Sequence, residues 1–213
     1  DVSRIRISKG AGGHAIIQVD ASGENSIVLH GGANQEVTRE QIEEVLGDFG
    51  KGDILLLQNE ISMIPDIIEA ADERGLRICL NPAPMKHEVE EYPLNKVDIL
   101  IVNETEGRDL SSENEPETIV KALSERYRCT VVLTLGAEGA MLSAEGAIEH
   151  IPGVKVTNVV DTTAAGDTFV GFFLAGLEEG MEMSAAVELG CKAGAACVAK
   201  AGAMDSIPAR REI

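Results

Sequence analysis

Continuous apolar runs alternate along this chain with segments whose apolar residues recur every three or four positions. The run over 53–58 predicts a strand buried on both faces, because such runs are typical of parallel sheets covered by helices. The segment 64–74 predicts a helix that ends at Gly75. The apolar face of this helix carries Ile64, Ile67, Ile68 and Ala71. Further strands are predicted at 77–80, 97–102 and 130–134, and further helices at 116–126 and 184–199.

Two hairpins interrupt this rhythm. Near the start, strands at 14–19 and 26–30 flank a predicted turn at 20–25, which indicates an antiparallel pair. Thr38 then caps a helix, with Gln41 completing a capping box. A second hairpin is predicted from strands at 140–143 and 147–151 around Glu145 and Gly146.

Strands that alternate with helices predict an α/β fold with a mostly parallel sheet between two helical layers. The length of 213 residues suits one domain over 1–213. Hydrophobic residues make up 44% of the chain, aromatic residues only 3%, and Trp is absent. We therefore expect a sizeable core built from aliphatic side chains.

Charge and residue spacing exclude several function classes. A formal net charge of −18 disfavours nucleic acid and anionic membranes as partners. No apolar run reaches about 18 residues and no signal-type segment is found, which favours a cytoplasmic location. The four cysteines lack C-x-x-C spacing and lie in apolar segments, so we expect buried, reduced thiols rather than a zinc site or disulfides. These cysteines are Cys79, Cys129, Cys191 and Cys197.

The run DTTAAGD over 161–167 carries the strongest chemical signal. It follows a β-branched stretch over 154–160 and precedes an apolar helical pattern, so it predicts a strand-to-helix turn. Backbone N–H groups at a helix start have no intrahelical partner, and small side chains let an anion approach them. A carboxylate at Asp167 would lie beside that anion and could accept a proton, as phosphoryl transfer requires. The alternative is an ordinary helix cap, for which Asp and Thr are common.

Polar or glycine-containing loops follow the predicted strands. In parallel sheets, ligands bind at the carboxyl ends of the strands, so these loops are expected to converge on one edge. The loops are 59–60, 81, 103–106, 134–139 and 161–167.

The motifs together resemble those of the ribokinase family of sugar kinases, the PfkB-type carbohydrate kinases, and the resemblance covers essentially the whole chain. The run over 161–167 resembles the family's DTxGAGD signature, with Ala164 in place of the glycine. Residues 103–106 resemble its NxxE motif, and 133–139 resemble its nucleotide loop. The segments closest to the ribokinase branch of that family are 23–25, 32–34 and 81–84. The resemblance implies a ribokinase-like three-layer α/β/α fold.

The resemblance implies a role for each matching residue. Asp167 would be the catalytic base, beside an anion hole formed by Ala164, Ala165 and Gly166. Glu60, together with Asp167, would contact the sugar. Asn103 and Glu106 would organise Mg²⁺ through water, with helix capping as the alternative for this pair. The residues that would border ATP are Asn103, Thr134, Leu135, Gly136, Ala137, Glu138, Gly139, Gly166 and Cys191, the last equally well explained by helix packing.

Similar kinases bind a monovalent cation beside the anion hole. Asp161 would be its carboxylate ligand, and oxygen ligands with one carboxylate suit K⁺. The other matching positions are Thr163, Cys197, Lys200, Gly202 and Ser206.

The start of the chain departs from the family pattern. Family members open with a strand whose Asp holds sugar hydroxyls, and a GGKGANQA-like loop then grips the sugar. Neither is found, and 31–35 is assigned to the later GAN element because it follows the hairpin. We therefore expect a C-terminal portion of a ribokinase-like kinase that holds the ATP site and the base. The hairpin over 14–30 is expected to be a lid remnant or a sheet edge.

The resemblance implies ATP-dependent phosphorylation of the primary hydroxyl of D-ribose to ribose 5-phosphate. Two alternatives stay open: another sugar or nucleoside kinase of the family, and a non-catalytic module that binds nucleotide or sugar. Whether a portion without the full sugar site is active in isolation also stays open. Because family members are often dimers through the lid, the intact enzyme is expected to be a homodimer.

Overall fold

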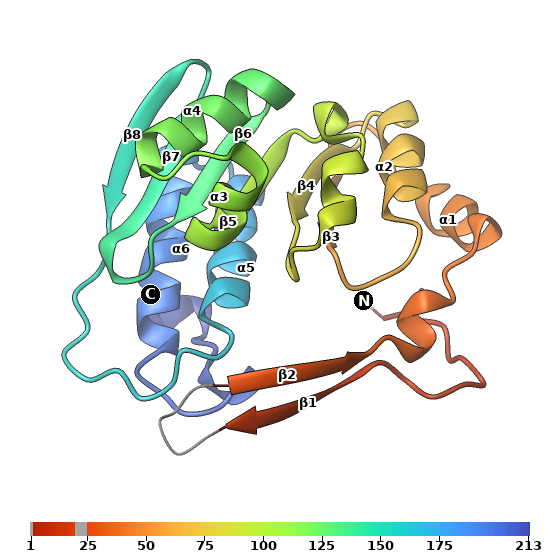
Figure 1. Cartoon of the computed structure of the whole chain (residues 1–213), viewed down its shortest axis with the longest axis horizontal. Helices are drawn as coiled ribbons and strands as arrows, with labels where there is room; N and C mark the ends of the chain where they lie inside the picture. The colour runs from red at the N-terminus through yellow and green to blue at the C-terminus, as the bar shows by residue number, and fades with distance from the viewer. Residues whose placement is uncertain (1, 20–24) are drawn as a thin grey trace. The chain divides into compact units, whose positions relative to one another are not determined.

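The computed structural model describes residues 2–19 and 25–213, which form two compact units, Asp1–Val97 and Asp98–Ile213. Figure 1 labels the elements of both units along the chain. The predicted single domain over 1–213 stays a prediction.

The first unit begins with the predicted hairpin. Strands β1 (His14–Val19) and β2 (Asn25–His30) pair antiparallel, with His14 opposite His30. The hairpin is therefore confirmed, whereas residues 20–24 of its predicted turn, and 23–24 of the ribokinase-like segment, lie outside the described residues. Its assignment as a lid remnant or sheet edge stays a prediction.

The rest of the first unit alternates strands and helices as predicted. The parallel pair is β3 (Ile54–Gln58) and β4 (Arg77–Asn81), with Ile54 opposite Arg77. Gln41 N–H donates to Thr38 Oγ1 at the start of α1 (3.3 Å), which is the Thr38 half of the predicted capping box. The helices are η1 (Gly32–Gln35), α1 (Arg39–Leu46), α2 (Ile64–Glu73), η2 (His87–Glu91) and η3 (Leu94–Lys96).

Burial confirms the apolar face of α2 and corrects the expectation for β3. All four predicted residues of the α2 face are buried, Ile68 and Ala71 completely. In β3, Leu57 is buried but Leu56 is 43% exposed. Because successive side chains of a strand point to opposite faces, only the Leu57 side of this strand is covered, and the prediction of two buried faces is wrong.

The second unit is a four-stranded sheet with helices on both faces. Strand β5 (Ile99–Asn103) pairs parallel with β6 (Thr130–Thr134), which pairs antiparallel with β7 (Gly139–Ala144), followed by β8 (Ala147–Pro152). Figure 1 shows α3 and α4 in front of these strands, and α5 and α6 behind them. The helices are α3 (Glu104–Ser111), α4 (Pro116–Tyr127), η4 (Gly136–Glu138), α5 (Ala165–Glu178), α6 (Met183–Cys197), η5 (Met204–Ser206) and η6 (Arg210–Glu212).

One predicted strand of this unit is wrong. Residues 153–164 form no strand, although their valines favour one. Backbone hydrogen bonds hold this segment near its ends, where Gly153 N–H donates to Glu138 O (3.1 Å) and Val160 N–H to Val198 O (2.8 Å). Val159 is 58% exposed. The turn at 161–167 is therefore a loop-to-helix turn rather than a strand-to-helix turn.

The core is aliphatic, as predicted. Fully buried side chains include Ile78 and Leu80 in the first unit, and Ile99, Leu123 and Phe173 in the second. All four cysteines are free thiols, and Cys79, Cys191 and Cys197 are buried as expected, but Cys129 is only partly buried. Among the described residues, no helix is both long and apolar enough to cross a bilayer.

Candidate functional site

The DTTAAGD run opens helix α5. Ala164 is its N-cap with a left-handed backbone (φ 60°), and Ala165 N–H donates to Thr162 O (3.3 Å) across the turn. Asp167 lies in the first helical turn and is exposed. A Cβ added at Gly166 would meet no atom within 4 Å. The helix start therefore presents an accessible carboxylate and an uncrowded backbone, as an anion site with an adjoining base requires.

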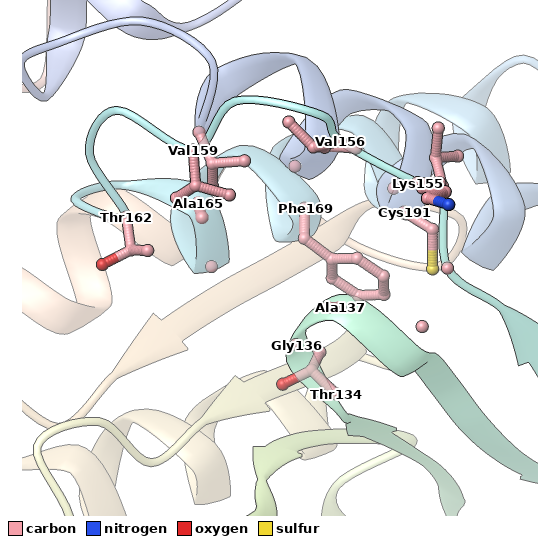
Figure 2. Close-up of a pocket in the computed structure, with 18 residues that line it drawn as sticks. Thr134, Gly136, Ala137, Lys155, Val156, Val159, Thr162, Ala165, Phe169 and Cys191 are labelled. Carbon is pink, nitrogen blue, oxygen red and sulfur yellow. The ribbon is translucent and has the colours of Figure 1, made fainter.

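A cavity of about 470 Å³ lies beside this helix start, within the size range of small-molecule sites. It lies within the second unit, between the loop after β6, the segment before α5, and the helices α5 and α6 (Figure 2). Seven predicted site residues line it: Thr134, Gly136, Ala137, Gly139, Ala165, Gly166 and Cys191. The structure thus brings the predicted nucleotide loop and the predicted anion hole to one cavity.

One position in the loop after β6 has a backbone conformation that only glycine adopts freely. Gly139 has φ 99°, and a Cβ there would lie 2.1 Å from Ile151 O. Leu135 N–H donates to Gly139 O (2.8 Å) and closes the loop. Leu135 and Glu138 were predicted with this loop, but neither lines the cavity, because Leu135 is buried and Glu138 is exposed elsewhere.

Helix α6 supplies a wall of small side chains that the sequence reasoning missed, apart from Cys191. A Cβ at Gly190 would lie 2.8 Å from the Phe169 ring, so the glycine lets α5 and α6 approach closely. Burial, with a smaller contribution from Glu188, raises the pKa of Cys191 to about 11, and its thiol is therefore neutral at pH 7. The wall residues are Gly190, Cys191, Gly194, Ala195 and Val198, whose helical spacing was the available signal.

The segment before α5 forms the remaining wall and was also missed, because its valines were interpreted as a strand. Its lining residues are Gly153, Val154, Lys155, Val156, Val159 and Thr162. Of the described residues that line the cavity, Lys155 alone carries a charged side chain (Figure 2). The cavity wall is otherwise made of apolar, small or neutral polar residues.

Asn103 and Glu106 form a capping box at the start of α3. Glu106 N–H donates to Asn103 Oδ1, and Asn103 N–H donates to Glu106 Oε2, both at 2.9 Å. Glu106 is 6% exposed, and burial raises the pKa of its carboxyl against the lowering effect of Asn103. The capping alternative is therefore observed, with the Glu106 side chain buried in the cap. Neither residue lines the cavity.

The predicted cation ligands cluster around Asp161. The Asp161 carboxylate accepts Thr163 N–H (2.9 Å) and Gly202 N–H (3.0 Å). Hydrogen bonding to the Thr163 side chain, together with these two N–H groups, lowers the pKa of Asp161 to about 2. Cys197 Sγ donates to Thr163 O (3.7 Å) and lies 3.1 Å from Ser206 Oγ. Lys200 N–H donates to Cys197 O (3.1 Å).

This cluster offers an ionised carboxylate with neighbouring carbonyl and hydroxyl oxygens, which are the donors that an alkali cation takes. Within the described residues, no three His, Cys, Asp or Glu side chains gather as a metal site. The oxygen donors around Asp161 suit a monovalent cation better than zinc, which takes nitrogen and sulfur ligands.

The predicted sugar residue lies in the first unit. Glu60 follows β3 and is exposed, and its carbonyl accepts a bond from Gln35 Nε2 (3.0 Å). Ser62 N–H donates to Asn34 O (2.9 Å). The GAN element in η1 and the loop after β3 are therefore held together.

Comparison with known proteins gives matches over nearly the whole chain. A family model described as pfkB family carbohydrate kinase matches residues 1–210. The chain is 38% identical to the ribokinase of Haemophilus influenzae, covering 97% of this chain and 69% of that protein. It is 37% identical to the ribokinase of Staphylococcus aureus, covering 98% of this chain and 71% of that protein.

Solved structures give the same result. The crystal structure of the ribokinase of Thermotoga maritima matches with a TM-score of 0.82 and 39% identity, covering 98% of this chain and 70% of that chain. The Arabidopsis thaliana ribokinase complexed with ribose and ATP matches with a TM-score of 0.80 and 30% identity, covering 95% of this chain and 68% of that chain.

Proposed function

The chain belongs to the pfkB family of carbohydrate kinases, and from this premise we propose that it phosphorylates the primary hydroxyl of D-ribose with ATP, giving ribose 5-phosphate. The predicted family and sugar-kinase class are confirmed by these matches. The ribokinase-like α/β fold is confirmed by the solved relatives. Ribose as the substrate and the roles of individual residues are what we propose beyond these matches.

The main support for this proposal is the geometry at the start of α5. Asp167 is exposed in the first turn, while Ala165 and Gly166 line the cavity. In the proposed reaction the Asp167 carboxylate takes the proton of the sugar hydroxyl as its oxygen attacks the γ-phosphorus of ATP. A positioned base of this kind contributes about 10²–10⁴-fold. The N–H groups at Ala164 and Gly166 stabilise the charge that develops on the transferred phosphoryl group, together with Ala165 N–H when it exchanges its 3.3 Å bond to Thr162 O for the phosphoryl oxygen.

The cavity would hold the nucleoside part of ATP. Its phosphates then extend toward the start of α5, where the helix dipole favours negative charge. Thr134, Gly136 and Ala137 border the ligand on one side, and the small residues of α6 border it on the other. The neutral Cys191 thiol suits the apolar base end of this site.

Asn103 and Glu106 would hold Mg²⁺ through water. When bound, Mg²⁺ neutralises phosphate charge during transfer. The fit rests on Glu106, because a buried carboxylate whose pKa is raised by desolvation is stabilised by a nearby cation. The oxygen cluster around Asp161 would hold K⁺ just before the anion hole. Its ligands are Asp161, Thr163, Cys197, Lys200, Gly202 and Ser206.

Ribose is proposed as the substrate because the relatives from Haemophilus influenzae and Staphylococcus aureus, at 38% and 37% identity, are ribokinases. Glu60 would contact the sugar. A deoxyribokinase of Salmonella typhi is 29% identical, which makes deoxyribose the second candidate. Phosphorylation rates for ribose and deoxyribose distinguish the two substrates. The expected homodimer and cytoplasmic location stay predictions.

The replacement Asp167→Asn tests the proposed base. Because Asp167 is exposed, the variant should fold, bind ATP with similar affinity, and lose about 10²–10⁴-fold in kcat. Glu178→Gln, at the other end of α5, is the matched control and should leave kcat unchanged. A coupled assay of ADP release gives kcat, and calorimetry gives the ATP affinity. An Asp167→Asn variant with wild-type kcat would exclude Asp167 as the base, and ATP binding without turnover in the wild type would favour the non-catalytic alternative.

A further inference from the structure

Asn59, directly before Glu60, is held by a buried set of hydrogen bonds in the first unit. Asn59 is only 3% exposed. Asn59 Nδ2 donates to Pro84 O (2.9 Å), and Asn59 Oδ1 accepts a bond from the Tyr92 hydroxyl (2.7 Å). Asn59 N–H also donates to Ala83 O (2.9 Å). Both ends of the amide are therefore used, and they connect the end of β3 to two later segments of the unit.

The residues after Asn59 are held by hydrogen bonds to residues that come earlier in the chain. Gln35 Nε2 donates to Glu60 O (3.0 Å), and Ser62 N–H donates to Asn34 O (2.9 Å). The backbone around Glu60 is thus fixed on one side through Asn59 and on the other through η1. An exposed carboxylate on a backbone restrained at both sides is preorganised for a ligand.

Tyr92 donates the hydrogen bond that completes this set around Asn59. Its side chain is half-buried at the end of η2, and its hydroxyl donates to an acceptor that is itself buried. Loss of that hydroxyl would leave Asn59 Oδ1 buried without this donor, and an unsatisfied buried acceptor favours rearrangement. The residue next in sequence to that acceptor is Glu60, so the rearrangement would shift its backbone.

We propose that Tyr92 is a positioning residue for the sugar, acting through Asn59 on the placement of Glu60. The proposal rests on the proposed function, in which Glu60 contacts the sugar. Because Tyr92 acts on a binding group and not on the base or the anion hole, its hydroxyl should affect sugar affinity and leave the chemical step unchanged.

The test is Tyr92→Phe, which removes the hydroxyl and keeps the ring. The KM for ribose should rise about five- to tenfold, the effect of losing one neutral hydrogen bond. The kcat at saturating ribose and the KM for ATP should stay within about twofold of the wild type. Tyr127→Phe is the matched control, because Tyr127 is the other tyrosine of the chain and ends α4 in the second unit. It should leave both KM values unchanged.

A second variant tests whether the hydroxyl acts through Asn59. Asn59→Leu should also raise the KM for ribose, and adding Tyr92→Phe to it should cause no further rise, because the hydroxyl has already lost its acceptor. Multiplicative effects of the two changes would overturn the proposed route. An unchanged KM for ribose in Tyr92→Phe, with only a lower melting temperature, would show a purely structural role. Failure of the proposed function is a different result: the wild type itself would then phosphorylate no sugar.

Discussion

Glu106 and Asn103 close the start of α3 with two reciprocal hydrogen bonds of 2.9 Å, each from the backbone N–H of one residue to the side chain of the other. The cap needs an acceptor at position 106 but no charge, since Gln serves equally in a capping box. A role with Mg²⁺ needs the charge. The two roles can therefore be separated by one substitution.

Glu106→Gln should keep the fold and lose activity. At pH 7 the variant should be at least as stable as the wild type, because it removes a buried charge and keeps the cap. Activity should fall about 10–100-fold, as for other groups that act around a metal, with a higher Mg²⁺ requirement. Thermal melts and Mg²⁺ titrations of the rate measure the two effects.

The pH dependence of the free energy of unfolding gives a second check on Glu106. Burial raises the pKa of its carboxyl, so its stabilising contribution is complete below about 4.5 and is lost as pH rises through the raised pKa. Urea unfolding from pH 4 to pH 8 should show this loss in the wild type and not in Glu106→Gln. Glu106→Ala is the comparison, because it removes the bond that the Glu106 side chain accepts from Asn103 N–H and should cost about 1 kcal/mol at pH 7. Equal destabilisation by Gln and Ala would contradict the separation of roles.

Asp161 should affect the pH dependence of the free energy of unfolding in the opposite sense to Glu106, and Asp161→Asn tests this. Bonds from Thr163 and Gly202 lower the pKa of Asp161 to about 2, so its contribution is present above the ordinary value of 3.8 and is lost as pH falls toward 2. The variant should lack this part of the acid-induced destabilisation between pH 4 and pH 2, followed by circular dichroism. Its rate should also lose any dependence on K⁺. A variant with an unchanged acid profile and unchanged K⁺ dependence would remove Asp161 from the proposed cation site.

Local patterns in the sequence were enough to predict most elements and much of the cavity. The α2 face and the hairpin β7–β8 follow from periodicity and turn residues, and both are confirmed. The α2 face and this hairpin depend on short-range rules, which a single sequence contains. Gly136 and Gly139 were assigned to the site by their resemblance to the family's nucleotide loop, and Gly166 by the helix-start pattern, and all three line the cavity.

The missed features depend on tertiary contacts. Helix α3 was not predicted because its sequence is polar, with Leu110 as its one large buried apolar residue. The segment 153–164 has strand propensity but no partner strand, and tertiary context overrides β propensity in such cases. The helical spacing of the small residues of α6 places them on one face, but glycine and alanine carry no sign of what packs against that face, so this wall was missed. Gly190 is explained only by the ring of Phe169.

Ala164→Gly should stabilise the protein. Ala164 has φ 60°, a left-handed conformation that costs a residue with a Cβ about 1–2 kcal/mol. Glycine adopts it freely but loses more entropy on folding, about 0.4–1 kcal/mol, so the net gain should be roughly 0.5–1 kcal/mol. Ala122→Gly, inside α4, is the control and should destabilise by about 1 kcal/mol. Urea denaturation measures both, and a destabilised Ala164→Gly would mean that its methyl group makes a contact that outweighs the strain.

Gly190→Ala should open the packing of α5 against α6 and damage the cavity. The new Cβ would lie 2.8–2.9 Å from two ring carbons of Phe169 and 3.0 Å from its carbonyl oxygen, which is closer than ordinary contacts. Because Phe169 is only 5% exposed, its ring has little room to move, and overpacking of this kind costs about 1–3 kcal/mol. Both residues line the cavity, so the KM for ATP should rise as well.

Gly171→Ala in α5 is the control for this prediction. Its Cβ would meet nothing within 4 Å, and alanine should raise stability by about 0.5–1 kcal/mol. Melting temperatures and ATP titrations distinguish the two variants, and a Gly190→Ala protein that melts and binds ATP like the wild type would show that this close approach of the helices is not required.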